Sequence, residues 1–323
     1  MRALRIVSYD GPDAVELADD VPEPSSADGV VVEVRAAGVS FPEVLQTRGA
    51  YQVKPELPYV PGGEVAGVVR SAPEGSDLRP GDRVVAGTLL GGFAEVAVAP
   101  PFLTFRLPDA LDFAQGAGLI VNYHTAWFAL KMRGALAEGE RVLVHGAAGG
   151  VGTAALQVAK ALGASTIAVV SSDEKEAVAR EAGADEVVRS DGPWREQVQE
   201  LTGGGVDVVF DPVGGDRFLD SLRALREDGR LLVIGFAAGD IPEVRVNRLL
   251  LRNTSLVGVF WGGYAMGKPD LNREIGARVE ELVEAGAIRP VVGARFPLER
   301  GAEALRLLDG RGATGKVVLE VSS

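Results

Sequence analysis

The chain has 323 residues, enough for two domains, and its composition (46% hydrophobic, with 42 glycines) is ordinary for an α/β protein with many turns. Its 45 Asp and Glu against 33 Lys and Arg give a formal net charge of −12, which disfavours binding to nucleic acid or to an anionic membrane surface. No apolar run reaches the roughly 20 residues of a membrane span, and Asp10 follows the N-terminal apolar run too closely for a signal peptide, so we expect a cytoplasmic protein.

The first hundred residues are a succession of short apolar runs broken by Gly and Pro. Turn sequences such as Pro80-Gly81-Asp82 separate these runs. This pattern predicts a small antiparallel, barrel-like domain. The expected strands cover residues 3–9, 29–37, 64–71, 83–87 and 93–98.

From about Asp112 the apolar residues recur at helical spacing, and strands then alternate with helices. Such alternation is typical of a doubly wound parallel sheet with helices on both faces. The six expected strands cover residues 141–145, 165–170, 186–189, 206–211, 230–235 and 255–259.

After Phe260 the pattern predicts a helix, a strand, a second helix and a closing strand, over residues 270–285, 291–296, 301–308 and 316–321. We expect this tail to fold back onto the N-terminal domain. The predicted domains are therefore residues 1–120 together with 260–323, and residues 121–259.

A glycine-rich turn lies between the strand that ends at His145 and the helix that follows. It comprises Gly146, Ala147, Ala148, Gly149, Gly150, Val151 and Gly152. A helix N-terminus placed after such a turn presents free amide groups and its positive dipole end to an anion, most often a dinucleotide pyrophosphate. Ala147 breaks the strict G-x-G-x-x-G spacing, but the strand, turn and helix context supports the same function. A P-loop is excluded, because Thr153 stands where that motif has Lys.

The end of the second strand predicts which dinucleotide binds. An acidic side chain there favours NADH, whereas this strand ends in Ser171 and Ser172 with Lys175 close by. Hydroxyl donors and a cation suit a 2′-phosphate, so we predict NADPH. If the strand ends two residues later, Asp173 or Glu174 could take the carboxylate role; alternatively, residues 173–175 are only a solvated helix start.

Metal ligands are scarce in this sequence. It has no cysteine, and its two histidines are His124 and His145. We predict no metal site, because zinc sites draw on these residue types. A single His on an apolar helix or at a strand end is more often a packing residue than a catalytic acid, and we expect this of both.

Five motifs in order along the whole chain resemble the medium-chain dehydrogenase/reductase superfamily, and within it the zinc-free quinone oxidoreductases related to zeta-crystallin. They are Gly62-Gly63-Glu64-Val65-Ala66-Gly67-Val68-Val69, Gly81-Asp82-Arg83-Val84, the glycine turn, Asp211-Pro212-Val213-Gly214-Gly215, and Gly315-Lys316-Val317-Val318-Leu319. The resemblance implies a GroES-like β-rich barrel domain and a Rossmann domain.

The resemblance also implies which residues form the site. Zinc alcohol dehydrogenases have Cys and Gly-His-Glu where this chain has Ser40 and Gly62-Gly63-Glu64. Glu64 would then form a structural ion pair or a cap. Tyr51 and Ser40 are the candidate hydrogen-bond donors to a substrate oxygen, although many relatives have Asn at the serine position. The residues implied to border the cofactor are Thr125, Gly235, Phe236, Phe260 and Trp261.

The resulting prediction is reduction by NADPH, in one-electron or two-electron steps, of a quinone or of the carbon–carbon double bond of an α,β-unsaturated carbonyl compound. The alternative is a nonenzymatic NADPH-binding protein of the crystallin type. The resemblance also implies a homodimer built around residues 255–259, and this run is apolar and would make a poor exposed sheet edge.

Overall fold

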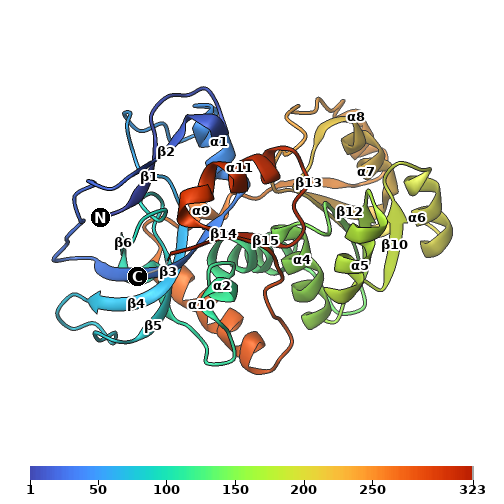
Figure 1. The fold of residues 1–323 in the computed structure, drawn as a ribbon. Helices are drawn as coiled ribbons and strands as arrows, with labels where there is room; N and C mark the ends of the chain where they lie inside the picture. Colours follow the sequence, from blue (N-terminus) through green and yellow to red (C-terminus); the bar gives the residue numbers. More distant parts are fainter. Residues whose placement is uncertain (322–323) are drawn as a thin grey trace. The chain divides into compact units, whose positions relative to one another are not determined.

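The computed structural model describes residues 1–321, which divide into two compact units (Figure 1). Unit 1 comprises Met1–Val121, Gly267–Glu284 and the residues from Arg289 onward. Unit 2 comprises Asn122–Met266 and Ala285–Ile288. The sequence placed the second border near residue 260, a few residues before the point where these units change over.

Unit 1 is built on a mostly antiparallel sheet, with strands in the order β14-β15-β3-β4-β5-β7 and β6 paired with β3. A separate hairpin joins β1 and β2. The bounds of these strands are β1 (Ala3–Ile6), β2 (Val15–Ala18), β3 (Val30–Val39), β4 (Glu64–Ser71), β5 (Arg83–Gly87), β6 (Val96–Ala99), β7 (Thr104–Arg106), β14 (Val292–Pro297) and β15 (Lys316–Glu320).

The C-terminal tail joins the N-terminal sheet of unit 1. Strand β15 pairs antiparallel with β3, and Val317 lies opposite Val39. Valines of both strands, together with Leu319 of β15, enter one buried core, so the tail folds back onto the N-terminal sheet. The helices of this unit are α1 (Phe41–Thr47), α2 (Phe113–Gly116), α10 (Pro269–Glu284) and α11 (Gly301–Asp309).

Unit 2 contains a parallel sheet with strands in the order β10-β9-β8-β11-β12-β13. The order reverses between β8 and β11, as in a doubly wound dinucleotide-binding fold. The predicted fold class, a Rossmann sheet with a β-rich GroES-like domain, is confirmed. The strands are β8 (Arg141–His145), β9 (Ser165–Val170), β10 (Glu186–Arg189), β11 (Val206–Asp211), β12 (Leu225–Val233) and β13 (Ser255–Gly258).

Helices connect these strands, and the strands are apolar because both faces of a parallel sheet are covered. The helices are α3 (Thr125–Trp127), α4 (Gly150–Ala161), α5 (Asp173–Glu181), α6 (Trp194–Thr202), α7 (Phe218–Ala224), α8 (Asn247–Leu250) and α9 (Trp261–Ala265). Two π-helical stretches, η3 (Leu119–His124) and η4 (Phe128–Arg133), flank α3.

Some predicted strands end at different residues in the structure. Strand β1 stops at Ile6 rather than residue 9, and β6 starts at Val96 rather than residue 93. Strand β12 runs from Leu225 to Val233 instead of covering 230–235, so Gly235 lies in the loop after it.

Within residues 1–321 no helix combines the length and the apolar character needed to cross a membrane.

Candidate active site

The glycine turn leads directly into helix α4. Gly149 is the N-cap residue and the helix begins at Gly150, three residues earlier than the sequence suggested. Gly146 has a positive φ of 57°, and the Gly149 amide donates to its carbonyl oxygen at 2.9 Å. The first intrahelical bond of this end runs from the Thr153 amide to the Gly149 oxygen at 2.9 Å. The amides before Thr153 therefore have no intrahelical partner and can bind an anion.

Gly152 is required by close packing rather than by its backbone angle. A Cβ atom at this residue would lie 2.2 Å from the Gly146 carbonyl oxygen. The first turn of α4 is therefore held against the glycine turn at a distance that only glycine permits. At Gly150 a Cβ atom would lie 2.7 Å from Nδ2 of Asn122.

The turn after β8 meets the loop after β11, at the point where the strand order reverses. A Cβ on Gly146 would lie 3.3 Å from Cγ2 of Val213. The loop after β12 joins the same edge, because the Ala237 amide donates to the Pro212 oxygen at 3.1 Å. The carboxyl ends of parallel strands at such a reversal are where doubly wound folds bind ligands.

A polar and cationic cluster follows the end of β9. Ser172 caps helix α5 and accepts a hydrogen bond from the Lys175 amide at 3.3 Å, while Lys175 Nζ lies 3.4 Å from Oγ of Ser171. Arg189, at the end of neighbouring strand β10, donates to the Ser171 carbonyl oxygen at 3.2 Å and forms an ion pair with Asp173. Two cations and two hydroxyls therefore gather at one strand end.

Asp173 does not end this strand. Strand β9 stops at Val170, and Asp173 is the first residue of α5 with its side chain exposed to solvent. The alternative in which β9 continues two residues further is therefore wrong. Asp173 pairs with Arg189 at the helix N-terminus, where a carboxylate is favoured.

The remaining residues implied to border a cofactor lie in unit 2. Thr125 is half-buried between the two π-helical stretches, and Gly235 and Phe236 are in the loop after β12. Phe260 is 55% exposed, whereas Trp261 is buried at the start of α9. Phe260 offers an open aromatic face, and Trp261 packs within the unit.

Both histidines are buried packing residues, as the sequence predicted. The ring of His124 meets the ring of Trp261 edge-on at 5.3 Å, and burial lowers the pKa of His124 to about 3. His145 Nε2 lies 2.8 Å from Oγ of Ser221, and burial likewise lowers the pKa of His145. Both imidazoles are therefore mainly uncharged at neutral pH, and neither is an imidazolium acid.

Unit 1 contains a buried ion pair beneath a serine. Lys316 begins β15 and Glu64 begins β4, and their side chains are 2% and 0% exposed. Lys316 Nζ donates to Oε1 of Glu64 and, at 2.6 Å, to Oγ of Ser40. Glu64 Oε2 accepts from the Val121 amide at 2.9 Å. Of the two roles considered for Glu64, the structure shows the ion pair.

Glu43 is a second buried carboxyl group beside Ser40. It accepts hydrogen bonds from the amides of Ser40 at 2.8 Å and Gly63 at 3.0 Å. Burial, only partly offset by the nearby Lys316, raises the pKa of Glu43 to about 7. Burial, and secondarily the charge of Glu43, also raises the pKa of Tyr51, which therefore stays a neutral phenol that can donate a hydrogen bond.

Glu43 should make the stability of the protein depend on pH between about 4.5 and 7. The unfolded chain releases this proton near pH 4.5 and the folded chain only near pH 7, so the free energy of unfolding should fall by about 3 kcal/mol as pH rises across this window. Urea unfolding at pH 5 and pH 8 measures the fall. In Glu43→Gln the fall in the free energy of unfolding between these two pH values should be smaller by about 3 kcal/mol. An equal fall in both proteins would contradict the raised pKa of Glu43.

The serine, glycine and glutamate at the positions of the zinc ligands do not fit a zinc ion. Lys316 already donates to Ser40 and Glu64, the two oxygen-bearing side chains there. Between residues 1 and 321 no group of three or more His, Cys, Asp or Glu side chains is arranged to hold a metal. The Lys316 ammonium group therefore already occupies the oxygen atoms that a metal cation would need as ligands.

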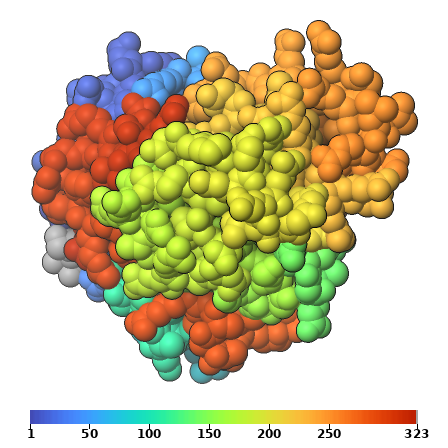
Figure 2. All heavy atoms as spheres, turned by 90° about the vertical axis from the view of Figure 1, so that its right-hand side faces the viewer, coloured from blue at the N-terminus to red at the C-terminus, as the bar shows by residue number. Residues whose placement is uncertain are grey.

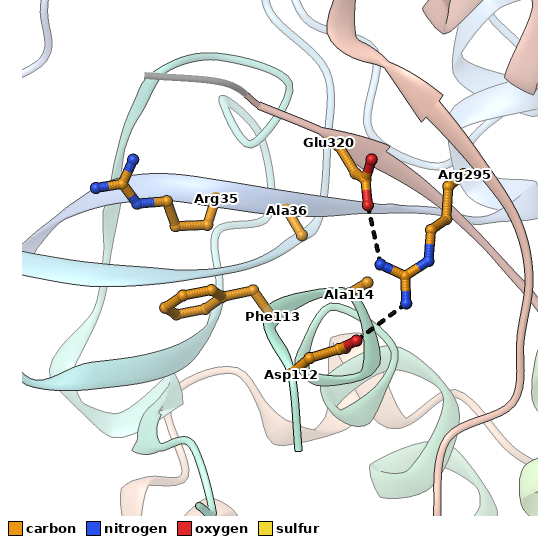
Figure 3. A pocket seen from close by; sticks show the side chains of 7 residues that line it. All are labelled: Arg35, Ala36, Asp112, Phe113, Ala114, Arg295 and Glu320. Carbon is orange, nitrogen blue, oxygen red and sulfur yellow. Dashed lines mark hydrogen bonds and ion pairs between the residues drawn. The ribbon is translucent and has the colours of Figure 1, made fainter.

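A hollow of about 240 Å³ lies elsewhere on unit 1 (Figure 3). Arg295 crosses it and bonds to Asp112 at 3.0 Å and to Glu320 at 2.9 Å. None of the predicted site residues lines it. We assign no ligand to this hollow.

Sequence reasoning missed Lys316, Glu43 and Arg189 as members of these clusters. A lysine among the buried residues 315–319 of a closing strand was a usable signal, because Lys is almost never buried unless it is paired. The position of Arg189 follows only from the pairing of β10 with β9, which sets Arg189 beside Val170.

Two family models match the chain. Residues 26–109 match the alcohol dehydrogenase GroES-like domain, and residues 150–275 match the zinc-binding dehydrogenase domain.

Similar proteins cover nearly the whole chain. Quinone oxidoreductase of Homo sapiens is 34% identical over 325 residues, which is 99% of this chain and 97% of the human protein. Quinone oxidoreductase-like protein 2 of Bos taurus is 39% identical over 93% of this chain and 87% of its own length. The quinone oxidoreductase of Thermus thermophilus, solved also in complex with NADPH, is 36% identical with a TM-score of 0.86, covering 99% of this chain and 100% of that one.

Proposed function

Because this chain belongs to the quinone oxidoreductase branch of the medium-chain dehydrogenase/reductase superfamily, we propose that it reduces a quinone with NADPH. One observation supports NADPH as the cofactor. The amide-rich start of α4 and the cations after β9 lie at the carboxyl ends of adjacent parallel strands. These groups suit the pyrophosphate and the 2′-phosphate of one NADPH molecule.

The chain's own residues bind and orient both reactants. The glycine turn and α4 hold the pyrophosphate, while Ser171, Lys175 and Arg189 bind the 2′-phosphate. Thr125 and the loop after β12 border the nicotinamide, which supplies a hydride when the cofactor is bound. Tyr51 and Ser40 are the proposed hydrogen-bond donors to the acceptor oxygen on which negative charge develops. Zinc takes no part, because Lys316 occupies its donor groups.

Removing either phosphate-binding cation should weaken NADPH binding selectively. We expect Lys175→Ala and Arg189→Ala each to raise the Kd for NADPH about tenfold, because each loses a charge-assisted bond to the 2′-phosphate. The Kd for NADH should stay unchanged, since its ribose carries no such phosphate. Fluorescence titration with both cofactors measures this, and Arg180→Ala, further along α5, is the control. Equal affinity of the unmodified protein for the two cofactors would contradict the proposal.

Turnover tests the proposed activity. Purified protein, NADPH and a panel of quinones should show cofactor oxidation, followed as a decrease in absorbance at 340 nm. Enones in the same panel test for reduction of a carbon–carbon double bond, and detection of semiquinone distinguishes one-electron from two-electron steps. Tight NADPH binding without turnover of any acceptor would instead indicate a nonenzymatic binding protein.

The edge of the unit 2 sheet supports a homodimer. Strand β13 ends the order of strands and pairs only with β12 among the described residues. The segment 240–265 lies at the surface in Figure 2, where it is orange. Its exposed apolar side chains include Ile241, Val246, Leu250 and Leu251, which are 73% to 77% exposed. We propose that a second copy covers this surface and continues the sheet edge to edge.

Introducing two carboxylates on this surface should dissociate the dimer into monomers. Light scattering of the parent protein should give twice the chain mass of 33.7 kDa. The double variant Leu250→Asp/Leu251→Asp should give the mass of one chain, because burying carboxylates in an apolar interface is unfavourable. Leu201→Asp, at a 47% exposed leucine on α6, is the control and should remain dimeric. A monomeric parent protein would contradict the proposed assembly.

A further inference from the structure

We propose that Lys316 is a positioning residue that acts through Ser40: its buried ammonium turns the Ser40 hydroxyl into a charge-assisted donor for the acceptor oxygen that becomes negative during reduction. This inference rests on the proposed function and adds a residue to it. Its basis is the contact of Lys316 Nζ with Oγ of Ser40 at 2.6 Å, inside a site that does not fit a metal.

The direction of the Ser40 hydrogen follows from hydrogen-bond chemistry. An ammonium group can only donate, so Lys316 Nζ uses a lone pair of Ser40 Oγ. The serine O–H must therefore point away from the lysine. Among the hydrogen bonds of residues 1–321, none has this hydroxyl as its donor. Ser40 is half-buried while Lys316 is 2% exposed, so the hydroxyl lies between the charge and the more open side.

The ion pair is oriented with its positive end at the serine. Glu64 uses one carboxylate oxygen for Lys316 and the other for the Val121 amide, and neither oxygen bonds Ser40. The Glu43 carboxylate binds the backbone amide of Ser40, and the Glu43 amide faces the Ser40 side chain in a capping box. The charged side chain in direct contact with Ser40 Oγ is therefore Lys316.

The lysine is also fixed in position along its stem. A Cβ on Gly38 would lie 2.6 Å from Cε of Lys316, and a Cβ on Gly118 would lie 3.3 Å from its Cγ. The stem thus runs through a passage bordered by two glycines. A fixed charge behind a hydroxyl requires little reorganisation when negative charge appears in front of it, which is the arrangement that stabilises an oxyanion.

The reaction step is balanced with the cofactor as reductant. A hydride carries two electrons from NADPH to the acceptor and leaves NADP⁺, and the negative charge settles on the acceptor oxygen. Ser40 donates a hydrogen bond to that oxygen without losing its proton. The reduced acceptor takes one proton from water on release, so the sum is acceptor, NADPH and H⁺ giving reduced acceptor and NADP⁺.

Binding of p-nitrophenol tests the oxyanion site without any turnover. Its phenolate absorbs near 400 nm, so a titration in the presence of excess protein reports the pKa of the bound phenol. The parent protein should lower that pKa by about one unit or more, because charge-assisted hydrogen bonds are roughly twice as strong as neutral ones. Ser40→Ala and the neutral pair Lys316→Met/Glu64→Gln should both abolish the shift. No shift in the parent protein, or the same shift in Ser40→Ala, would overturn the inference.

Kinetics with a graded quinone series supplies the second readout. In Lys316→Met/Glu64→Gln, kcat/KM should fall about 100-fold for tetramethylbenzoquinone, whose reduced oxygen is strongly basic, and less than about tenfold for a tetrachlorobenzoquinone. A purely structural defect would lower both rates by one factor, and that result would overturn the inference. Arg2→Met/Glu95→Gln removes another ion pair of unit 1, at 2.7 Å, and should change neither readout.

The two readouts also separate this inference from the proposed function. If the pKa shift of bound p-nitrophenol depends on Ser40 and Lys316 but none of the tested quinones is reduced, quinone reduction is contradicted and the oxyanion site is retained. Turnover of quinones with no such shift would retain the enzyme and defeat the role of Lys316.

Discussion

Replacing Gly152 with alanine should raise the Kd for NADPH at least about 100-fold, because the first turn of α4 would be forced away from the glycine turn. The added Cβ would lie 2.2 Å from the Gly146 carbonyl oxygen, a contact that no rotamer can relieve. The amides of the helix start and the turn would then no longer be aimed at the same pyrophosphate. Fluorescence titration with NADPH measures the loss.

Gly204→Ala is the matched control for this substitution. It adds the same methyl group to unit 2 where nothing lies within 4 Å of the new Cβ, so its Kd should equal that of the parent protein. Far-UV circular dichroism should show that both variants are folded. A Gly152→Ala protein that binds NADPH as tightly as the Gly204→Ala protein would show that the cofactor does not depend on this turn.

Lys316→Met should lower the free energy of unfolding by about 3 to 5 kcal/mol, the largest stability effect that we expect of a single substitution. Its side chain is 2% exposed, and its removal leaves Glu64, which is 0% exposed, as an unpaired charge in the core. The methionine replaces most of the aliphatic stem, so the loss is chiefly electrostatic. Urea unfolding of the two proteins measures the difference.

The double variant separates charge from packing. Lys316→Met/Glu64→Gln leaves no buried charge in the pair, and the glutamine oxygen can still accept from the Val121 amide. We expect it to recover most of the lost stability, because replacing both members of a buried ion pair is often close to neutral. A double variant as unstable as Lys316→Met would mean that poor packing of the methionine, rather than the unpaired charge of Glu64, sets the effect.

The sheet of unit 2 could be predicted closely because each strand is a local apolar run. Strands β8, β9, β10 and β11 have the predicted bounds. Strand β12 was predicted to start too late, since Glu227, Asp228 and Gly229 are residues typical of a turn. In the structure Asp228 has a φ of 61° and the pairing with β11 shifts register near this point, so a bulge interrupts the strand without ending it.

Elements of unit 1 were missed where tertiary pairing supplies the stability. Strand β7 is three residues long and, within residues 1–321, pairs only with β5, while β2 forms a hairpin with β1. Neither carries a periodic signal long enough to be recognised. Helix α1 was missed although Pro42 suits the first turn of a helix that Ser40 begins.

The candidate site, like the fold, has one part that could be predicted from the sequence and one part that could not. The glycine turn and the serines after β9 were predictable because they are contiguous in the sequence. The pair of Lys316 with Glu64 joins residues 252 positions apart, and only the pairing of β15 with β3 and of β3 with β4 brings them together. Arg189 depends in the same manner on strand order. Residues gathered by sheet topology cannot be read from local spacing.

A crystal structure with NADPH bound would show directly which residues hold the cofactor. We expect density for the pyrophosphate against the amides of Gly150, Val151 and Gly152, with the 2′-phosphate against Lys175 and Arg189. We also expect Lys316 Nζ, with no metal ion, between Ser40 and Glu64. Cofactor density away from the glycine turn, or a metal ion bound by Glu64 in place of the lysine, would contradict it.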